Sequence, residues 1–599
     1  GDAFASFLLG LVDGASLVVN SDSVATDAHF GYNAWYAQTD WRIRPNLTLN
    51  LGLRYEIPVP RSTDPNAFSA FDPNVTDPRS GLKGGVAFAG DCSGCTGQSR
   101  FGNIDYSSIG PRLGLAWSAN QKTVVRLGYG IYYAAGNGLT GGFCLRCATG
   151  YSSTASLTRP SSTGAALQWD NGFVPSPSFL RPPIVSPSAG NATDDIYYIS
   201  PDSGKAPRFQ NWSISIQREL PFKFVAEVAY IGIRGTRLSS SHQPLNHLDP
   251  KYYALGALLN QRIDSPQVVA AGYKIPYANF IADWTTTVAG VTSSTATLAR
   301  ALRPYPHING PVNNLYNPIG KTWYDSLQLK LDRRFGLVNF EGNYTWSKAL
   351  TNASGTQTGG DASNRNPKTD NPYNPNFAEI EKSLQYTDFP HILNIVAVVD
   401  LPFGKGRKLL NKNAFLDRVF GGWSASFTGN YTSGALYLLN APFTYPQWGF
   451  EYGRKKVNLN GNPIRTGISR QDLDPRAGLS PGSTVFNRAN AKPWINADFF
   501  TIPGAFELGT APIYINELRD PNQYTDNVGF IKRTRITETV NFEIRAEFFN
   551  VFNRTNFGTG AAPNRPNVTD TNPATGRFGV PSGARSGPRA GQITAKINF

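Results

Sequence analysis

The chain has 599 residues, of which 16% are charged and 12% are aromatic, and its 56 Lys and Arg residues outnumber 42 Asp and Glu to give a net charge of +14. One soluble core usually stops growing near ~250–300 residues, so this length predicts several domains, a repeat array or one very large barrel. No uncharged apolar run approaches the ~18–20 residues of a membrane-spanning helix, which excludes a helical membrane protein.

The chain contains no Met and begins at Gly1, and its apolar stretch 4–12 has no basic segment before it. A secretory signal peptide has such a segment. We therefore interpret this region as a strand or a connection, with a poorly defined strand near residues 8–20. We expect the chain to be processed or to be part of a longer protein.

Paired segments with alternating apolar and polar residues follow along the chain. In the segment 47–56, Leu47, Leu49, Leu51 and Leu53 alternate with polar residues and a glycine. Successive side chains of a strand point to opposite faces, so each segment predicts a strand with one apolar face. With the strand near 8–20 they make about fourteen strands, most of them near the ~9–11 residues of a tilted bilayer crossing. The predicted strands are 34–43, 47–56, 112–118, 123–133, 211–219, 224–233, 325–334, 338–347, 392–401, 423–432, 530–538, 541–552 and 590–599.

The connections between these strands alternate between short and long. A compact soluble domain rarely has structureless connections beyond ~12–15 residues, whereas an outer-membrane barrel has short periplasmic turns and long external loops. The sequence therefore predicts an all-β fold, an antiparallel transmembrane β-barrel over residues 29–599, preceded by a segment 1–28 that starts the barrel portion or connects a plug to it. The predicted extracellular loops are 57–109, 134–207, 236–320, 348–383, 433–525 and 553–588.

Aromatic residues near the strand ends predict the interfacial girdle of a barrel, although strands favour aromatic residues in any case. These residues are Trp35, Tyr36, Trp41, Tyr55, Tyr132, Tyr133, Tyr344, Trp346, Trp423 and Tyr431. The polar residues of the strands are expected to face the lumen, where they would line a solute path or pair with one another. They are Arg54, Glu56, Arg126, Glu227, Gln328, Lys330, Glu341, Glu543, Arg545 and Glu547, and we assign no binding residue from them.

Two Cys-x-x-Cys motifs, Cys92 with Cys95 and Cys144 with Cys147, fall in predicted external loops. In an oxidising compartment such cysteines form disulfides, either within each motif or between the two loops. A four-thiolate zinc site is the alternative, but the 48 residues between the motifs and the exposed, oxidising position argue against it. We therefore expect disulfides and no metal.

No residue pattern in the chain indicates catalysis. His242 and His247 share a loop with Asp249 and could help to hold a metal or a siderophore, but isolated polar loop residues are the simpler interpretation. Gly-x-Ser-x-Gly, His-Glu-x-x-His and phosphate-binding motifs are absent from the sequence, so we expect neither an enzyme nor a cofactor. The densest basic cluster, residues 404–413, is interpreted as a solvated turn, so nucleic acid is not an expected partner.

Several strand-bearing segments carry a family resemblance when they are taken together. They are NAWYAQTDWRIRPNLTLNLGLRYE (33–56), LPFGKGRKL (401–409) followed by GGW (421–423), NFEIRAEFFNVFNRTNFG (541–558) and the terminal ITAKINF. These segments resemble the barrel of TonB-dependent outer-membrane receptors, and specifically their Oar-like branch. Such receptors have an N-terminal plug, a short TonB-binding segment and about 22 strands. The resemblance implies that this chain is the C-terminal barrel portion of a 22-stranded receptor.

The resemblance and the loop asymmetry imply a receptor in the outer membrane of a Gram-negative-type bacterium. It would take up a scarce or bulky solute, such as an iron chelate, a cofactor, an oligosaccharide or a peptide, with energy supplied by TonB. The expected partners are outer-membrane lipid and lipopolysaccharide, the TonB complex through a missing N-terminal segment, and the unknown solute. The alternatives are a structural or adhesive surface protein that acts through its loops, and a self-contained pore of about fourteen strands.

Overall fold

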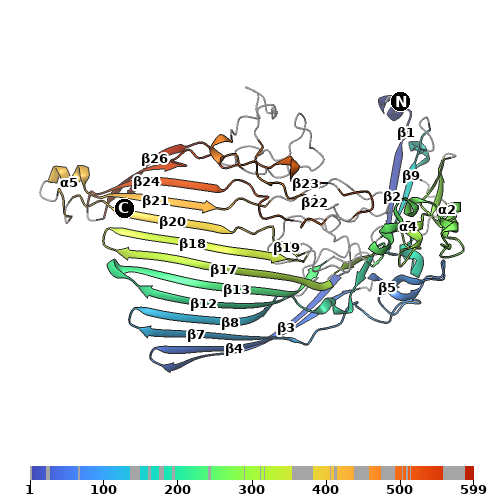
Figure 1. Cartoon of the computed structure of the whole chain (residues 1–599), viewed down its shortest axis with the longest axis horizontal. Helices are drawn as coiled ribbons and strands as arrows, with labels where there is room; N and C mark the ends of the chain where they lie inside the picture. Colours follow the sequence, from blue (N-terminus) through green and yellow to red (C-terminus); the bar gives the residue numbers. More distant parts are fainter. Residues whose placement is uncertain are drawn as a thin grey trace.

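The computed structural model describes residues 3–21, 27–64, 68–134, 149–159, 164–173, 181–191, 196–240, 245–288, 291–310, 312–315, 317–353, 382–404, 407–410, 414–436, 457–473, 493–501, 503–507, 510–512, 514–537, 539–557 and 587–599. Its dominant element is an antiparallel sheet of 14 strands, the stack of long arrows in Figure 1. Thirteen of these strands are neighbours in chain order. They are β3 (Asp27–Arg44), β4 (Leu47–Asp64), β7 (Ser108–Asn120), β8 (Thr123–Tyr133), β12 (Arg208–Glu219), β13 (Phe224–Ser240), β17 (Asn317–Phe335), β18 (Val338–Thr351), β20 (His391–Asp400), β21 (Trp423–Thr432), β24 (Gln523–Arg535), β25 (Asn541–Phe549) and β26 (Ala590–Asn598).

Each of these thirteen strands overlaps one predicted segment, which confirms the antiparallel all-β fold. The prediction that a segment near residues 8–20 forms a further strand of the barrel is wrong, because this segment does not belong to the large sheet. There, β2 (Gly14–Asn20) pairs with β9 (Ser152–Thr158) in a separate two-stranded sheet. Its sequence has a short apolar run at 17–19 instead of regular alternation, so it lacks the one-sided face of the other strands. The fourteenth strand is instead β19 (Ser383–Leu384), which pairs with β18.

Short turns join the strands at one end of the large sheet and long connections join them at the other. Between β7 and β8, for example, only Gln121 and Lys122 intervene. The β17–β18 turn has Gly336 at a φ of 69°, a left-handed conformation that glycine adopts without steric cost. The longest connection at the short-turn end joins β20 to β21 and contains α5 (Ala414–Phe420), at the left of Figure 1. The predicted alternation of short and long connections is therefore present.

The long connections contain folded structure of their own, which the sequence analysis did not predict. Three of them contribute to a four-stranded sheet in the order β16 (Asn313–Leu315), β11 (Tyr197–Ile199), β5 (Ser69–Thr76) and β6 (Lys83–Phe88), at the right of Figure 1. Most of the largest fully buried side chains belong to these connections and not to the large sheet. One core is built around Leu259, Phe280 and Leu298, and a second around Ile495 and Leu518.

Smaller elements complete the turns and connections. Paired short strands are β1 (Leu11–Val12) with β10 (Leu167–Gln168), β14 (Thr285–Val288) with β15 (Val291–Ser294), and β22 (Asn458–Leu459) with β23 (Phe500–Thr501). The other α-helices are α1 (Ala3–Leu8), α2 (Pro266–Ala270), α3 (Phe280–Asp283) and α4 (Leu298–Ala301). The 3-10 helices are η3 (Trp169–Asn171), η4 (Pro187–Gly190), η5 (Pro201–Gly204), η6 (Pro221–Lys223), η7 (Pro250–Asn260), η9 (Arg470–Asp472) and η11 (Ala497–Phe499). In the described part of the chain, no helix has the length and apolar character needed to cross a bilayer.

The strand registers divide the side chains of the large sheet into two faces. Directly paired residues point to the same side, so Leu51 and Leu127 lie on one face, which we call the apolar face. Arg54 and Arg126 lie on the opposite face, which we call the polar face. The same division continues through every pair of neighbouring strands to β26.

The registers also test the predicted aromatic girdle. Most of its members lie on the apolar face, where a girdle must be. The prediction is wrong for Tyr36 and Tyr132, because Tyr36 pairs with Arg54 and Tyr132 pairs with Phe209 on the polar face. The girdle residues on the apolar face are Trp35, Trp41, Tyr55, Tyr133, Tyr344, Trp346, Trp423 and Tyr431.

Candidate functional site: the polar face of the large sheet

The polar residues expected to face the lumen all lie on the polar face. This follows from the registers, which are continuous from β3 to β26 and place directly paired residues on the same face. Lys330, for instance, pairs with Glu227 on β13 and with Asn343 on β18. The complete set is Arg54, Glu56, Arg126, Glu227, Gln328, Lys330, Glu341, Glu543, Arg545 and Glu547.

Near the short turns, the charged residues of this face pair with one another. The Arg533 Nε donates to Glu543 Oε2 at 2.8 Å, and Arg545 donates to the other carboxylate oxygen of Glu543. The Lys330 Nζ lies 3.1 Å from an Asp332 oxygen and 3.6 Å from a Glu341 oxygen. These groups satisfy one another across neighbouring strands, which is a structural role.

A second polar cluster, made of Tyr32, Arg54 and Glu56, lies on β3 and β4. The Tyr32 hydroxyl donates to Glu56 Oε2 at 2.7 Å, and Arg54 Nε donates to Glu56 Oε1 at 2.5 Å. Arg54 Nη2 also donates to the Tyr32 hydroxyl oxygen at 3.1 Å. Because Glu56 is only 5% exposed, this closed set of hydrogen bonds fixes its carboxylate.

A groove of about 460 Å³ lies on the polar face. Its floor is made of glycines on three adjacent strands, and Gly114 pairs directly with Gly128. Glycine has no side chain, so the surface of the sheet is hollowed where these residues meet. The floor residues are Gly52, Gly114, Gly128 and Gly130, and the polar side chains around them are Gln38, Asn50, Arg112, Tyr132, Asn211 and Ser213.

Arg112 is the charged residue of this groove. Its guanidinium carbon lies 4.8 Å from the centroid of the Tyr132 ring, a cation–π contact. The Tyr132 ring in turn lies against Gly130, where an added Cβ would be 2.6 Å from the ring. Among the described residues, no carboxylate forms an ion pair with Arg112, which leaves guanidinium donors facing the groove.

The sequence analysis did not identify this groove. The signal was present as glycines at alternate positions 128 and 130, with a further glycine at 114 on the preceding predicted strand. Alternate positions of a strand share one face, so this pattern predicts a hollow on the side that faces away from the leucines. Only the pairing of Gly114 with Gly128 shows that the glycines are adjacent.

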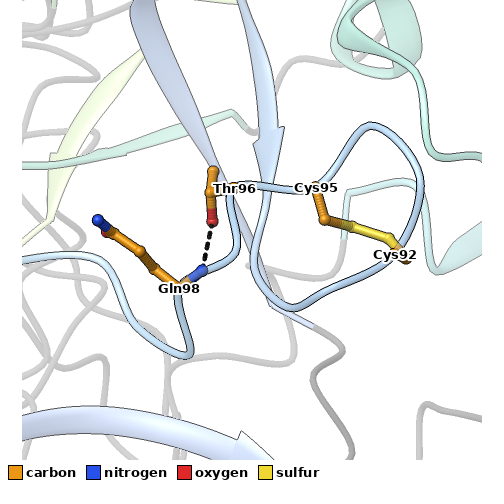
Figure 2. Close-up of a disulfide and its surroundings, with 4 residues drawn as sticks. All are labelled: Cys92, Cys95, Thr96 and Gln98. Atoms are coloured by element: carbon orange, nitrogen blue, oxygen red, sulfur yellow. Dashed lines mark hydrogen bonds between the residues drawn. A yellow bond between two sulfur atoms is a disulfide. The ribbon is translucent and has the colours of Figure 1, made fainter.

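The first cysteine motif forms a disulfide in the connection that follows β6. Cys92 and Cys95 are bonded, as Figure 2 shows. Their Cα atoms lie 5.1 Å apart. The same loop is held by the Gln98 backbone N–H, which donates to the Thr96 hydroxyl at 3.3 Å. Cys144 and Cys147 lie outside the described residues, and their pairing stays a prediction.

The histidine loop offers no metal site in the described part. His242 lies outside the described residues. Asp249 caps η7 by accepting the Lys251 backbone N–H at 3.0 Å, which is the main reason that its pKa lies below the usual value. Among the described residues, no three His, Cys, Asp or Glu side chains form a group that could bind a metal ion.

A family model described as an outer membrane beta barrel domain matches residues 1–592. The chain belongs to the outer membrane beta barrel domain family. It is therefore a protein of a Gram-negative-type outer membrane, and its large sheet is the wall of a transmembrane barrel. In such barrels the apolar face contacts lipid and the polar face lines the interior, so the glycine-floored groove faces inward.

Several solved outer-membrane proteins are similar to this outer membrane beta-barrel chain at low identity. They include the ferripyoverdine receptor of Pseudomonas aeruginosa (9% identity, TM-score 0.36), the FrpB iron transporter of Neisseria meningitidis (9%, 0.35) and the outer membrane transporter YddB of Escherichia coli (10%, 0.36). Each comparison covers 96% of this chain, which spans 39%, 45% and 55% of those chains respectively. A search of curated proteins found no match.

Proposed function

We propose that this chain is the barrel portion of a TonB-dependent receptor of the Oar-like branch. It takes up a scarce or bulky solute, namely an iron chelate, a cofactor, an oligosaccharide or a peptide, with TonB-supplied energy that enters through a segment outside this chain. The observation that carries the proposal is the inward-facing groove with Arg112 at its side. The segments 33–56 and 541–558, which resemble such receptors, contribute β25 and most of β3 and β4.

The directions of the edge strands support a barrel larger than thirteen strands. Successive strands from β3 to β26 are antiparallel, so the two edge strands run in the same direction. Direct closure would pair them in parallel, whereas bacterial outer-membrane barrels are antiparallel with an even number of strands. An odd number of further strands restores that rule and also pairs the edge N–H and C=O groups that lipid cannot satisfy. This reasoning argues against a self-contained pore made of the described strands.

The chemistry of the groove favours a solute rich in oxygen. Arg112 supplies charge-assisted hydrogen bonds, which suit carboxylate, phosphate or chelating oxygens. Asn50, Asn211 and Ser213 add neutral donors and acceptors around the same floor. This combination fits iron chelates, oligosaccharides and peptides better than an apolar solute.

Uptake by cells tests the proposal. A strain that lacks the full-length gene is complemented with the wild type, with Arg112→Ala, or with Arg334→Ala as a control, because Arg334 is 76% exposed near the short turns. We expect Arg112→Ala to slow uptake of the labelled solute by roughly tenfold, which corresponds to the loss of one charge-assisted hydrogen bond. The control variant should match the wild type. Uptake must also stop when the proton-motive force is dissipated. Unchanged uptake in the deletion strain would contradict a receptor role.

The folded connections favour one alternative, a structural or adhesive surface protein. These connections have buried cores of their own and also expose large aromatic side chains. Trp169 and Tyr106, for example, are 74% and 61% exposed. Such a surface suits contact with a matrix or another cell. A deletion strain that adheres normally but fails to grow on a defined solute supports the receptor, and the opposite result supports adhesion.

A further inference from the structure

A second hollow, of about 1000 Å³, lies at the long-connection end of the sheet and on the other face. Its sheet side is made by Tyr431 and Tyr524, which pair across β21 and β24. These two residues share the apolar face with Phe427 and Val528, which lie nearer the short turns. The hollow is therefore on the lipid side of the barrel and is separated by the sheet from the groove on the polar face. We call it the outward pocket.

Two arginines from different connections meet in the outward pocket. The guanidinium carbons of Arg470 and Arg554 lie 4.2 and 5.2 Å from the centroid of the same Tyr524 ring. One acidic side chain lies beneath them: Arg554 Nη1 is 3.3 Å from Asp526 Oδ2, and the Tyr431 hydroxyl donates to Asp526 Oδ1. Asp526 is fully buried beneath the two guanidinium groups, whereas both arginines line the pocket.

Hydrogen bonds hold the Arg470 side chain in place but do not use all of its donors. Its Nη2 donates to the Thr555 carbonyl at 2.5 Å and to Asn556 Oδ1 at 2.8 Å. Its Nε is buried and has no hydrogen-bond partner in the described part of the chain. Burial lowers the pKa of Arg470, Tyr524 acts in the opposite sense, and the like charge of Arg554 lowers the pKa further. A bound anion would relieve the repulsion between the two guanidinium groups.

Besides the arginines and the polar residues Ser469, Asn553 and Thr555, the pocket has an apolar side. Leu473 and Phe557 are buried in its lining, and Phe552 is 60% exposed beside them. Below the pocket, the apolar face continues along β21, β24 and β25 as Phe427, Val528 and Phe548. An occupant therefore needs an anionic group for the arginines and an apolar part that extends down this face.

We propose that the outward pocket binds the phosphorylated headgroup of an outer-leaflet glycolipid. The phosphate lies between Arg470 and Arg554, and the acyl chains follow the apolar face toward the short turns. The position fits, because Tyr431 and Tyr524 lie at the long-connection ends of β21 and β24, and the aromatic residues near the strand ends of a barrel are those expected at the headgroup layer. Arginine also suits phosphate because its planar guanidinium presents several donors at once.

Lipid binding to the full-length protein in detergent tests this proposal. The probes are diphosphoryl lipid A, the same lipid after enzymatic removal of its phosphates, and inorganic phosphate, each titrated by native mass spectrometry. The variants are Arg470→Gln, Arg470→Lys and the control Arg334→Gln on the polar face. Hydrogen exchange of the wild-type protein with and without lipid A locates the site without any substitution.

We expect the wild type to retain lipid A and to lose it when the phosphates are removed. Arg470→Gln should weaken binding at least tenfold and Arg470→Lys, which keeps the charge but not the planar set of donors, should weaken it less, whereas Arg334→Gln should stay within about threefold of the wild type. Lipid A should slow exchange in 469–473 and 552–557. Equal binding of the dephosphorylated lipid, inorganic phosphate that competes at the same concentration as lipid A, or protection elsewhere on the barrel would each overturn the proposal. If Arg470→Gln fails to fold, the exchange and dephosphorylation results still decide.

Discussion

Arg112 and Tyr132 form one unit on the polar face, in which the guanidinium carbon lies 4.8 Å from the ring centroid. The ring can lie flat because Gly130 beneath it has no side chain. Aromatic rings that cover strand glycines stabilise sheets, and here the same arrangement orients the cation of the groove. The groove therefore depends on a glycine and not only on the residues that would contact a solute.

The first prediction concerns this glycine. Gly130→Ala places a Cβ 2.6 Å from the Tyr132 ring, so the ring must move and Arg112 loses its support. We expect uptake to fall several-fold while the barrel still assembles. Gly14→Ala, on β2 and outside the groove, is the control, because its Cβ would be 3.6 Å from the nearest atom, an ordinary contact. Equal uptake by the two variants, measured at equal surface abundance, would show that ring position is irrelevant.

The second prediction concerns stability at the long-connection end. Arg519 Nη2 lies 2.5 Å from Asp388 Oδ2, and the two side chains are only 6% and 1% exposed. Arg519→Ala leaves a buried carboxylate without its cation, which should cost about 3–5 kcal/mol in the unfolding free energy of this region. Arg262→Ala breaks the exposed pair with Asp264 and should cost less than about 1 kcal/mol. Denaturant-dependent proteolysis measures both, and similar costs would contradict the assigned burial.

The third prediction is a pH dependence at His307. This side chain is 2% exposed and its Nε2 lies 2.7 Å from the Gly84 carbonyl oxygen. Burial lowers the pKa of His307 below 6.5, against the smaller opposing effects of the Gly84 carbonyl and Asp77. The unfolded chain thus binds a proton more readily than the folded one. The stabilising contribution is complete above pH 6.5 and is lost as the pH falls from 6.5 toward the folded-state pKa.

The variant His307→Gln tests this pH dependence. It should be less stable than the wild type at pH 7.5 but should lose less stability between pH 7 and pH 5, a range in which glutamine does not titrate. Proteolysis of the connection that contains His307, at a series of denaturant concentrations and pH values, measures the difference. Parallel pH profiles for the two proteins would contradict a neutral, buried imidazole.

The fourth prediction separates disulfides from zinc. Alkylating reagent added to the unfolded, unreduced protein should not label Cys92 or Cys95, which are bonded to each other. We expect the same of Cys144 and Cys147. Labelling should appear only after reduction, and treatment with a chelator should not change it. Labelling that a chelator induces without reduction would favour thiolate coordination of a metal instead.

The strands of the large sheet were predictable because their environment repeats along the chain. Lipid on one side and polar groups on the other impose a period of two, which the sequence shows openly in 47–56 and 590–599. The ends of the strands were less accurate. β24 begins at Gln523, seven residues before the predicted start, because Tyr524 and Asp526 continue the pairing with β21 beyond the apolar band.

The connections and the outward pocket were not predictable, since they depend on residues far apart in the chain, and the groove was indicated only by its alternating glycines. The parallel pairing of β11 with β5 and β16 joins three connections, and no local pattern indicates it. Arg470 and Arg554 are likewise separated by 84 positions and meet only through Tyr524. Tyr36 and Tyr132 show the same limit within the strands, because their aromatic character alone did not reveal which face they occupy.

The central claim is that the apolar face contacts lipid and the polar face lines the barrel interior. Spin labels introduced by Leu51→Cys, Leu329→Cys, Asn50→Cys and Gln328→Cys in the full-length protein, reconstituted in lipid, test it most directly. We predict that labels at Leu51 and Leu329 collide mainly with oxygen dissolved in the bilayer, and that labels at Asn50 and Gln328 collide mainly with a water-soluble nickel complex. Equal accessibility of neighbouring positions, or the reverse pattern, would contradict the two-faced sheet and the uptake function that depends on it.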